Sequence, residues 1–151
     1  MKKLCYFVFT VYITVMIYLL FGQRIGFNTV GTYFEQLTHN YNFLPFNTVS
    51  EYIDMAFTSP NIHLRGHAFI NLLGNIIMFI PLGFLLPCLF GSTRKFSKHI
   101  LICTSVIFII EFIQLFSLLG SCDIDDLILN ICGTSSGFAV FILIKHLTKR
   151  I

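Results

Sequence analysis

The sequence predicts an all-α integral membrane protein, a four-helix bundle with an extracytoplasmic loop that carries a short interfacial helix. Hydrophobic residues make up 56% of the 151 positions and charged residues only 11%, whereas soluble domains are about 25% charged. Four apolar runs reach the roughly 18–20 residues that cross a bilayer core. They are residues 4–21, 71–90, 100–119 and 127–144. They leave no room for a separate soluble domain, so we expect one membrane domain over residues 1–151.

The distribution of basic residues predicts how these runs are oriented across the membrane. Most lie before the first run, between the second and third, or after the fourth: Lys2, Lys3, Arg94, Lys95, Lys98, Lys145, Lys149 and Arg150. Because cytoplasmic loops are enriched in Lys and Arg, we expect a multi-pass plasma-membrane protein with both termini in the cytoplasm. A cleaved signal peptide is the alternative for the first run. Its length, and the absence of a small-residue cleavage site after Leu20, favour a retained anchor.

Residues 22–70 form the one long loop, expected on the outer side. Its motif residues Asn42, Pro45 and Phe46 mix apolar rings with polar groups, as sequences at a bilayer interface do. Thr48 and Glu51 match a capping box, which predicts a short helix lying on the outer membrane surface. A helix packed over the bundle is an alternative that is compatible with it.

Polar side chains inside the apolar runs are the main functional signal. Six form a candidate functional cluster: Asn75, Glu111, Gln114, Asp123, Asp126 and Asn130. At about 1.5 Å per residue, the members inside the runs lie in the outer half of the bilayer, and nothing comparable is expected in the inner half. If the helix faces that carry them meet, they form a polar pocket that opens outward with carboxylates at its mouth. Glu111 is the leading candidate, because an acidic residue in a span costs roughly 2.5–3.5 kcal/mol.

Other features of the spans have simpler interpretations. Helix–helix hydrogen bonding is the alternative role for Gln114, Asn75 and Asn130. Small or helix-breaking residues are expected to serve packing: Pro81, Gly83, Gly133 and Gly137. The five cysteines show no metal-binding spacing and predict no disulfide. His63 and His67 have an incomplete ligand set, so we expect no metal and no cofactor.

The order of these motifs resembles the VanZ-like family, whose namesake is a teicoplanin resistance protein. The resemblance rests on the Asn42 loop, on the segment from Asn71 through Pro81 and Gly83, on Glu111 with Gln114, and on the segment from Asp123 to Gly137. It covers nearly the whole chain from residue 42 onward. It implies a protein of the Gram-positive cell envelope that lowers susceptibility to lipid-tailed glycopeptide antibiotics such as teicoplanin.

The resemblance implies a resistance phenotype but no molecular mechanism. Our hypothesis is that the polar cluster engages membrane lipids or a lipid-linked wall precursor at the outer leaflet. One alternative is an intramembrane enzyme that modifies a lipid head group, with Glu111 as acid or base, although no complete catalytic constellation is visible. Another is a small interaction subunit of a cell-envelope complex. No partner among nucleic acids is expected, because the charges are placed for topology.

Overall fold

The structure is a computed structural model, and it describes residues 2–22 and 32–148. The elements follow in the order α1 (Lys2–Phe21), α2 (Tyr33–His39), β1 (Tyr41–Asn42), α3 (Asn47–Thr58), α4 (Ile62–Leu89), the 3-10 turn η2 (Gly91–Arg94), α5 (Phe96–Ser117), β2 (Cys122–Asp123) and α6 (Ile124–Thr148). The predicted all-α class is confirmed. The parallel pairing of the two short strands is an addition that the sequence did not predict.

Four helices, α1, α4, α5 and α6, are long and apolar enough to cross a membrane. Their number and order match the four predicted runs, so the chain is a multi-pass membrane protein. The boundaries differ most in α4, which begins at Ile62 rather than at residue 71. Its 28 residues extend about 42 Å, whereas the hydrocarbon core is about 30 Å thick. The first turns of α4 are therefore long enough to project beyond the core.

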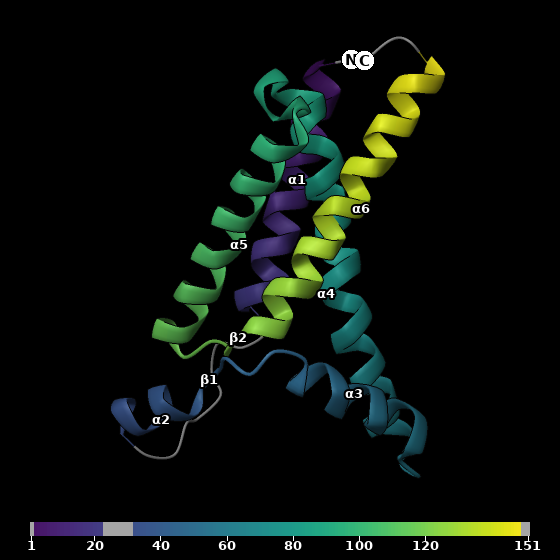
Figure 1. Cartoon of the computed structure of the whole chain (residues 1–151). Helices are drawn as coiled ribbons and strands as arrows, with labels where there is room; N and C mark the ends of the chain where they lie inside the picture. Colours follow the sequence, from purple (N-terminus) through teal and green to yellow (C-terminus); the bar gives the residue numbers. More distant parts are fainter. Residues whose placement is uncertain (1, 23–31, 149–151) are drawn as a thin grey trace.

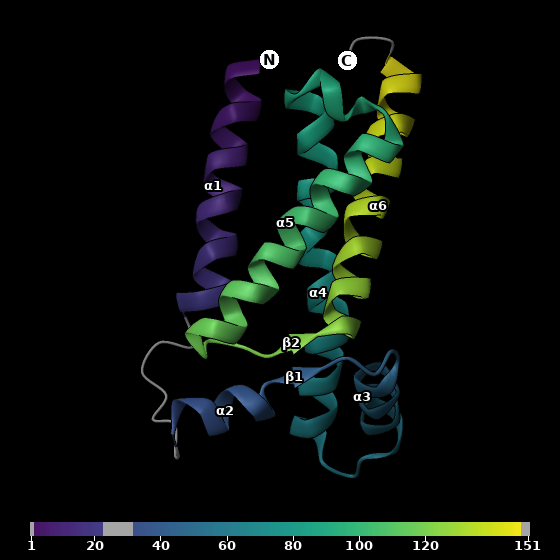
Figure 2. The ribbon, with the colours of Figure 1, turned by 60° about the vertical axis from the view of Figure 1, so that its left-hand side comes forward.

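The bundle has two different ends (Figures 1 and 2). The start of α1, the turn between α4 and α5, and the end of α6 lie together at one end. The two strands, α2 and α3 lie at the other, which we call the capped end. Most of the clustered basic residues belong to the first end; Lys149 and Arg150 lie outside the described residues. The chain thus crosses the bundle four times, and α2, β1 and α3, which lie between α1 and α4 in sequence, are all at the capped end.

Helix α3 packs beside the projecting part of α4 (Figure 1). Its Ala56 is fully buried, while Ile53 and Phe57 remain exposed. The Nε of Arg65 on α4 donates to the carbonyl of Ala56, 3.0 Å away. Arg65 therefore satisfies a carbonyl near the end of α3, where the intrahelical donors run out. The side-by-side packing agrees with the predicted helix over the bundle.

Backbone contact between α4 and α6 forms the tightest seam of the bundle. A Cβ atom added at Gly133 would collide with the carbonyl of Ile76, and one at Gly137 with that of Ile80. From the opposite helix, a Cβ at Gly83 would collide with the carbonyl of Thr134. Small residues let transmembrane helices approach closely, which replaces the hydrophobic driving force that lipid removes. The three glycines therefore set the distance between these parallel helices.

Helix α4 continues through Pro81 and Pro87 without ending. A proline removes one intrahelical hydrogen bond and crowds the carbonyl four residues earlier, so the turn before Pro81 is loosened. The hydroxyl of Tyr12 on α1 donates to the Met78 carbonyl in that turn, at 2.9 Å. Beyond the other proline, the Nε of Arg94 donates to the Pro87 carbonyl at 3.1 Å. Neighbouring elements thus place hydrogen-bond donors close to both prolines.

The seam can be tested with matched glycine substitutions. We expect Gly137→Ala to destabilise the bundle by about 1–3 kcal/mol, because an overpacked helix contact must shift the backbone. Gly74→Ala on α4 is the control, since its added Cβ meets nothing within 4 Å, and alanine gains about 0.5–1 kcal/mol in a helix. Thermal unfolding of the purified proteins in detergent measures both. Equal stability of the two variants would contradict backbone contact at the seam.

Candidate functional site

The candidate functional cluster lies toward the capped end, where β1 and β2 pair two segments that are distant in sequence. Tyr41 pairs with Cys122 and Asn42 with Asp123. The N–H of Cys122 also donates to the carbonyl of Asn40 at 2.8 Å. This short ladder brings the loop motif of the N-terminal half against the acidic segment that opens α6.

Asp123 caps the N-terminus of α6. Its Oδ1 accepts the N–H of Asp125 at 2.9 Å, which satisfies one of the amides that a helix start leaves without an intrahelical partner. Its Oδ2 accepts the hydroxyl of Thr48 at 2.6 Å. The same Thr48 oxygen accepts Nδ2 of Asn42 at 2.8 Å. Asp123 therefore joins the start of α6 to the first turn of α3.

Asp125 caps α3 from a different helix. The carboxylate has no exposed surface, and it accepts the N–H of Phe46 at 2.5 Å and that of Val49 at 3.0 Å. These are the N-cap and third residues of α3, the same two amides that a capping box satisfies. A negative group at a helix N-terminus is also stabilised by the helix dipole. The sequence did not single out Asp125, although its place in the acidic segment was visible.

The predicted capping box of Thr48 and Glu51 is wrong. Helix α3 begins at Asn47, its N-cap is Phe46, and no side chain of its own segment caps it. Thr48 lies inside the first turn, with its hydroxyl turned to Asp123. The prediction failed because a capping pattern in sequence assumes a local acceptor, and here the acceptor comes from α6.

The loop motif residues shape the approach to this cap. Asn42 Oδ1 accepts the N–H of Leu44 at 3.1 Å, a local turn that Asn side chains favour. Phe46 follows Pro45 and takes a left-handed backbone conformation with φ of 65°, which is uncommon for a residue with a Cβ. Its ring is exposed while its N–H points to Asp125. The turn therefore contributes to the site by directing the N–H of Phe46 toward Asp125.

Asn75 and Asp126 link α4 to α6 at the same level. Nδ2 of Asn75 donates to Oδ1 of Asp126, and Asp126 is half-buried. One turn further along α6, Asn130 is only 3% exposed, and its Oδ1 has no hydrogen-bond partner among the described residues. Leaving a buried acceptor unsatisfied costs about 1–3 kcal/mol. Asn75, Asp126 and Asn130 therefore form a polar strip along the contact between α4 and α6.

Glu111 and Gln114 lie on the buried face of α5. Glu111 is 4% exposed and Gln114 is 5% exposed. Nε2 of Gln114 donates to the carbonyl of Leu20 at 3.3 Å, so this side chain holds the end of α1 against α5. The shared face expected from their i, i+3 spacing is the one that faces the bundle.

Cys122 on β2 brings Glu111 into the same neighbourhood. Burial of the thiol raises its pKa, and the nearby carboxylates of Glu111 and Asp123 raise this pKa further. Helix α5 contacts β2, and Glu111 lies within the last two turns of α5, so its carboxylate belongs to the capped half of the bundle. Its carboxylate and the acidic segment of α6 thus belong to one electrostatic environment.

The arrangement differs from the expected outward pocket with carboxylates at its mouth. Asp123 and Asp125 are buried, and each accepts backbone amides at the start of a helix. These two carboxylates assemble the capped end rather than face an opening. Glu111 lies inside the span formed by α5, within its last two turns, and is 4% exposed. Asn75, Asp126 and Asn130 extend the polar environment along α6.

Another correction concerns the opposite half of the bundle, which was expected to lack strongly polar groups. His99 on α5 is fully buried. Its Nε2 lies 3.5 Å from the Sγ of Cys103, and its ring lies against that of Phe138 with centroids 4.6 Å apart. The prediction missed His99 because the residue lies just before the apolar run that was taken as the span.

A family model described as VanZ/LLP1 matches residues 7–145. The chain belongs to the VanZ/LLP1 family. This confirms the resemblance, and the match extends to α1, which the sequence motifs did not cover. No protein with a curated description and no solved structure matches the chain. The comparisons therefore give the family of the chain but no activity, and the function has to be inferred from the geometry.

Removing the charge of Asp125 tests the cap. We expect Asp125→Asn to lower the free energy of local opening of α3 by about 1–3 kcal/mol, because hydrogen bonds to a charged acceptor are stronger than those to a neutral one. Hydrogen exchange of the α3 amides measures the change. Asp54→Asn on the exposed side of α3 is the control and should leave exchange near normal. Unchanged protection in Asp125→Asn would show that the carboxylate does not hold α3.

Proposed function

We propose that this VanZ-like protein lowers susceptibility to lipid-tailed glycopeptides such as teicoplanin by acting at the outer leaflet on lipid or on a lipid-linked wall precursor. The observation that carries the proposal is the burial of Glu111 within the last two turns of α5, toward the capped end. Ionisable groups within spans are costly and mark ligand sites or proton pathways by default. The family relationship supports the phenotype, and the geometry supports the location.

The structural roles of the other acidic residues favour Glu111 as the functional carboxylate. Asp123 and Asp125 have structural duties at helix starts, so substituting them should disturb folding first. Glu111 is buried on α5 and is not among the groups that cap these helix starts. Asn75 and Asp126 provide polar neighbours at the same end. Of these acids, Asp126 is the one that is only half-buried, so a lipid head group at this end would meet its carboxylate, which accepts hydrogen bonds from hydroxyl and ammonium donors.

The proposal requires the capped end to face outward, as the positions of the basic residues favour. We expect a cysteine at Ser121 to react with a membrane-impermeant maleimide added to intact cells, and one at Ser92 to react only after permeabilisation. Both positions are exposed. The five native cysteines are replaced in this background. The native Cys122 is a poor reporter, since its burial and raised pKa slow its reaction. The reverse labelling pattern would overturn the orientation.

Susceptibility measurements test the function. Expressed in a susceptible Gram-positive host, the chain should raise the inhibitory concentration of teicoplanin several-fold more than that of vancomycin. Both drugs bind the same wall precursor, but only teicoplanin carries an acyl tail that partitions into the outer leaflet. Glu111→Gln and Asp126→Asn, compared at matched abundance, should each weaken this difference.

Asp54→Asn is the control for the loss of a carboxylate, because Asp54 is exposed on α3. It should retain full protection. Equal protection against the two drugs would indicate a changed wall precursor and contradict action through the acyl tail or its surrounding lipids. Full protection by Glu111→Gln at normal abundance would show that Glu111 is not part of the functional site.

A further inference from the structure

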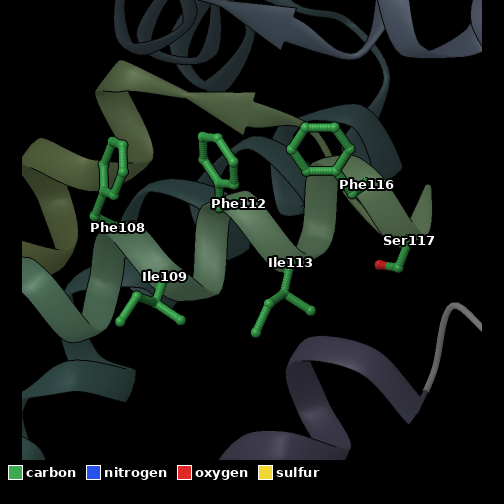
Figure 3. A pocket seen from close by; sticks show the side chains of 6 residues that line it. All are labelled: Phe108, Ile109, Phe112, Ile113, Phe116 and Ser117. Carbon is green, nitrogen blue, oxygen red and sulfur yellow. The ribbon is translucent and has the colours of Figure 1, made fainter.

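A shallow apolar hollow of about 560 Å³ lies on the face of α5 that points away from the bundle. Figure 3 shows its lining as two rows of side chains on successive turns. Phe108, Phe112 and Phe116 form one row, with ring centroids 5.5 and 5.0 Å apart. Ile109, Ile113 and Ser117 form the other. The hollow therefore runs along the helix between a row of rings and a shorter row.

The position of the hollow limits what can occupy it. It lies on a membrane-spanning helix and is continuous with lipid-exposed surface, since Phe108 and Phe112 are 53% and 47% exposed. From Phe108 to Ser117 the helix rises about 13.5 Å, close to half of the roughly 30 Å hydrocarbon core. The hollow thus spans about one leaflet, the depth that one acyl chain fills.

A second transmembrane helix fits this surface poorly. Helices in membranes approach each other through small residues, and the hollow is lined by phenylalanine and isoleucine, with Ser117 at one end only. A partner helix is about 10–12 Å wide and would make contact along the full core. The lining matches a slim and flexible apolar chain better.

The capped end of the hollow is polar. The hydroxyl of Tyr33 donates to the carbonyl of Phe116 at 2.9 Å, which holds α2 at the end of the hollow where Ser117 lies. The side chains of Thr32 and Glu35 at the start of α2 are exposed, so polar groups lie at this end of the hollow. The surface is thus apolar along one leaflet and polar at its end, the order of groups in a phospholipid.

We propose that this hollow is a binding site for one acyl chain of a bilayer phospholipid, with the lipid head group beside α2. The rings of Phe108, Phe112 and Phe116 form one wall, and Ile109 and Ile113 form the other. The site lies on the opposite side of the same helix turns as Glu111. It is independent of the proposed function, because it requires only that α5 spans a membrane.

The chain has no tryptophan, which allows a direct measurement. Phe112→Trp keeps a ring in the hollow, and Ile77→Trp places a probe on α4 that is 59% exposed. Both proteins are purified in detergent and titrated with a phosphatidylcholine that carries brominated acyl chains, which quench tryptophan on contact. We expect quenching of Phe112→Trp to saturate at one lipid per chain, and quenching of Ile77→Trp to rise without saturation.

A filling variant gives a second measurement. Ile109→Trp should lose the phospholipid that co-purifies with the unaltered chain in native mass spectrometry, whereas Ile77→Trp should retain it. Retention of lipid by Ile109→Trp, or the same unsaturated quenching at both probe positions, would overturn the proposal. A dimer that Ile109→Trp converts to a monomer would show that a second copy of the chain covers the hollow, and would also overturn it.

Teicoplanin protection separates this site from the proposed function. Loss of the retained lipid in Ile109→Trp with protection unchanged would support the acyl-chain site and make it separate from resistance. Retained lipid together with absent protection in the unaltered chain would reject the proposed function while leaving the site intact.

Discussion

The carboxylate of Asp125 connects the start of one helix to the start of another, and the capped end depends on this contact. A buried charge is tolerated only when it is paired or fully hydrogen-bonded, and Asp125 accepts two backbone amides of α3. Helix α3 has no cap of its own, so it needs an acceptor from elsewhere. With α3 held in this way, Thr48 reaches Asp123, and Asp123 in turn caps α6. The strand pair follows from the same placement, because Asn42 bonds to Thr48.

The glycine seam determines which polar groups share a level in the bundle. Contact at Gly133 and Gly137 sets the distance between α4 and α6, and it places Asn75 beside Asp126. Helix α1 is held differently, by the hydroxyl of Tyr12 and by Gln114 at its end. Most of its surface faces outward. The bundle is therefore a tight α4–α6 pair to which α5 and α1 are added, and polar groups serve as specific connections between helices.

Hydropathy was sufficient to predict the four spans, because each span must satisfy its own backbone in lipid and therefore needs a long apolar helix. The motif glycines were recognisable for a similar reason, since few residues allow such close helix contact. The cap of α3 could not be predicted, because Asp125 lies far from Phe46 in sequence and only the tertiary fold brings them together. The sequence pattern pointed to Asp123 and Asp126 but not to Asp125, which lies between them. Their duties differ because successive helix residues point in different directions.

The two sides of α5 suggest how one helix can serve a membrane protein in two ways. Glu111 and Gln114 face the bundle, while Phe108 and Phe112 face the hydrocarbon on the same turns. A group in the hollow does not contact the carboxylate, since the helix lies between them. Any influence of a lipid on Glu111 must therefore pass through the position of α5. That position is fixed at the capped end by Gln114 against α1 and by Tyr33 on the carbonyl of Phe116. The side chains that hold the end of α5 are thus also the ones through which lipid contact and the buried acid would be linked.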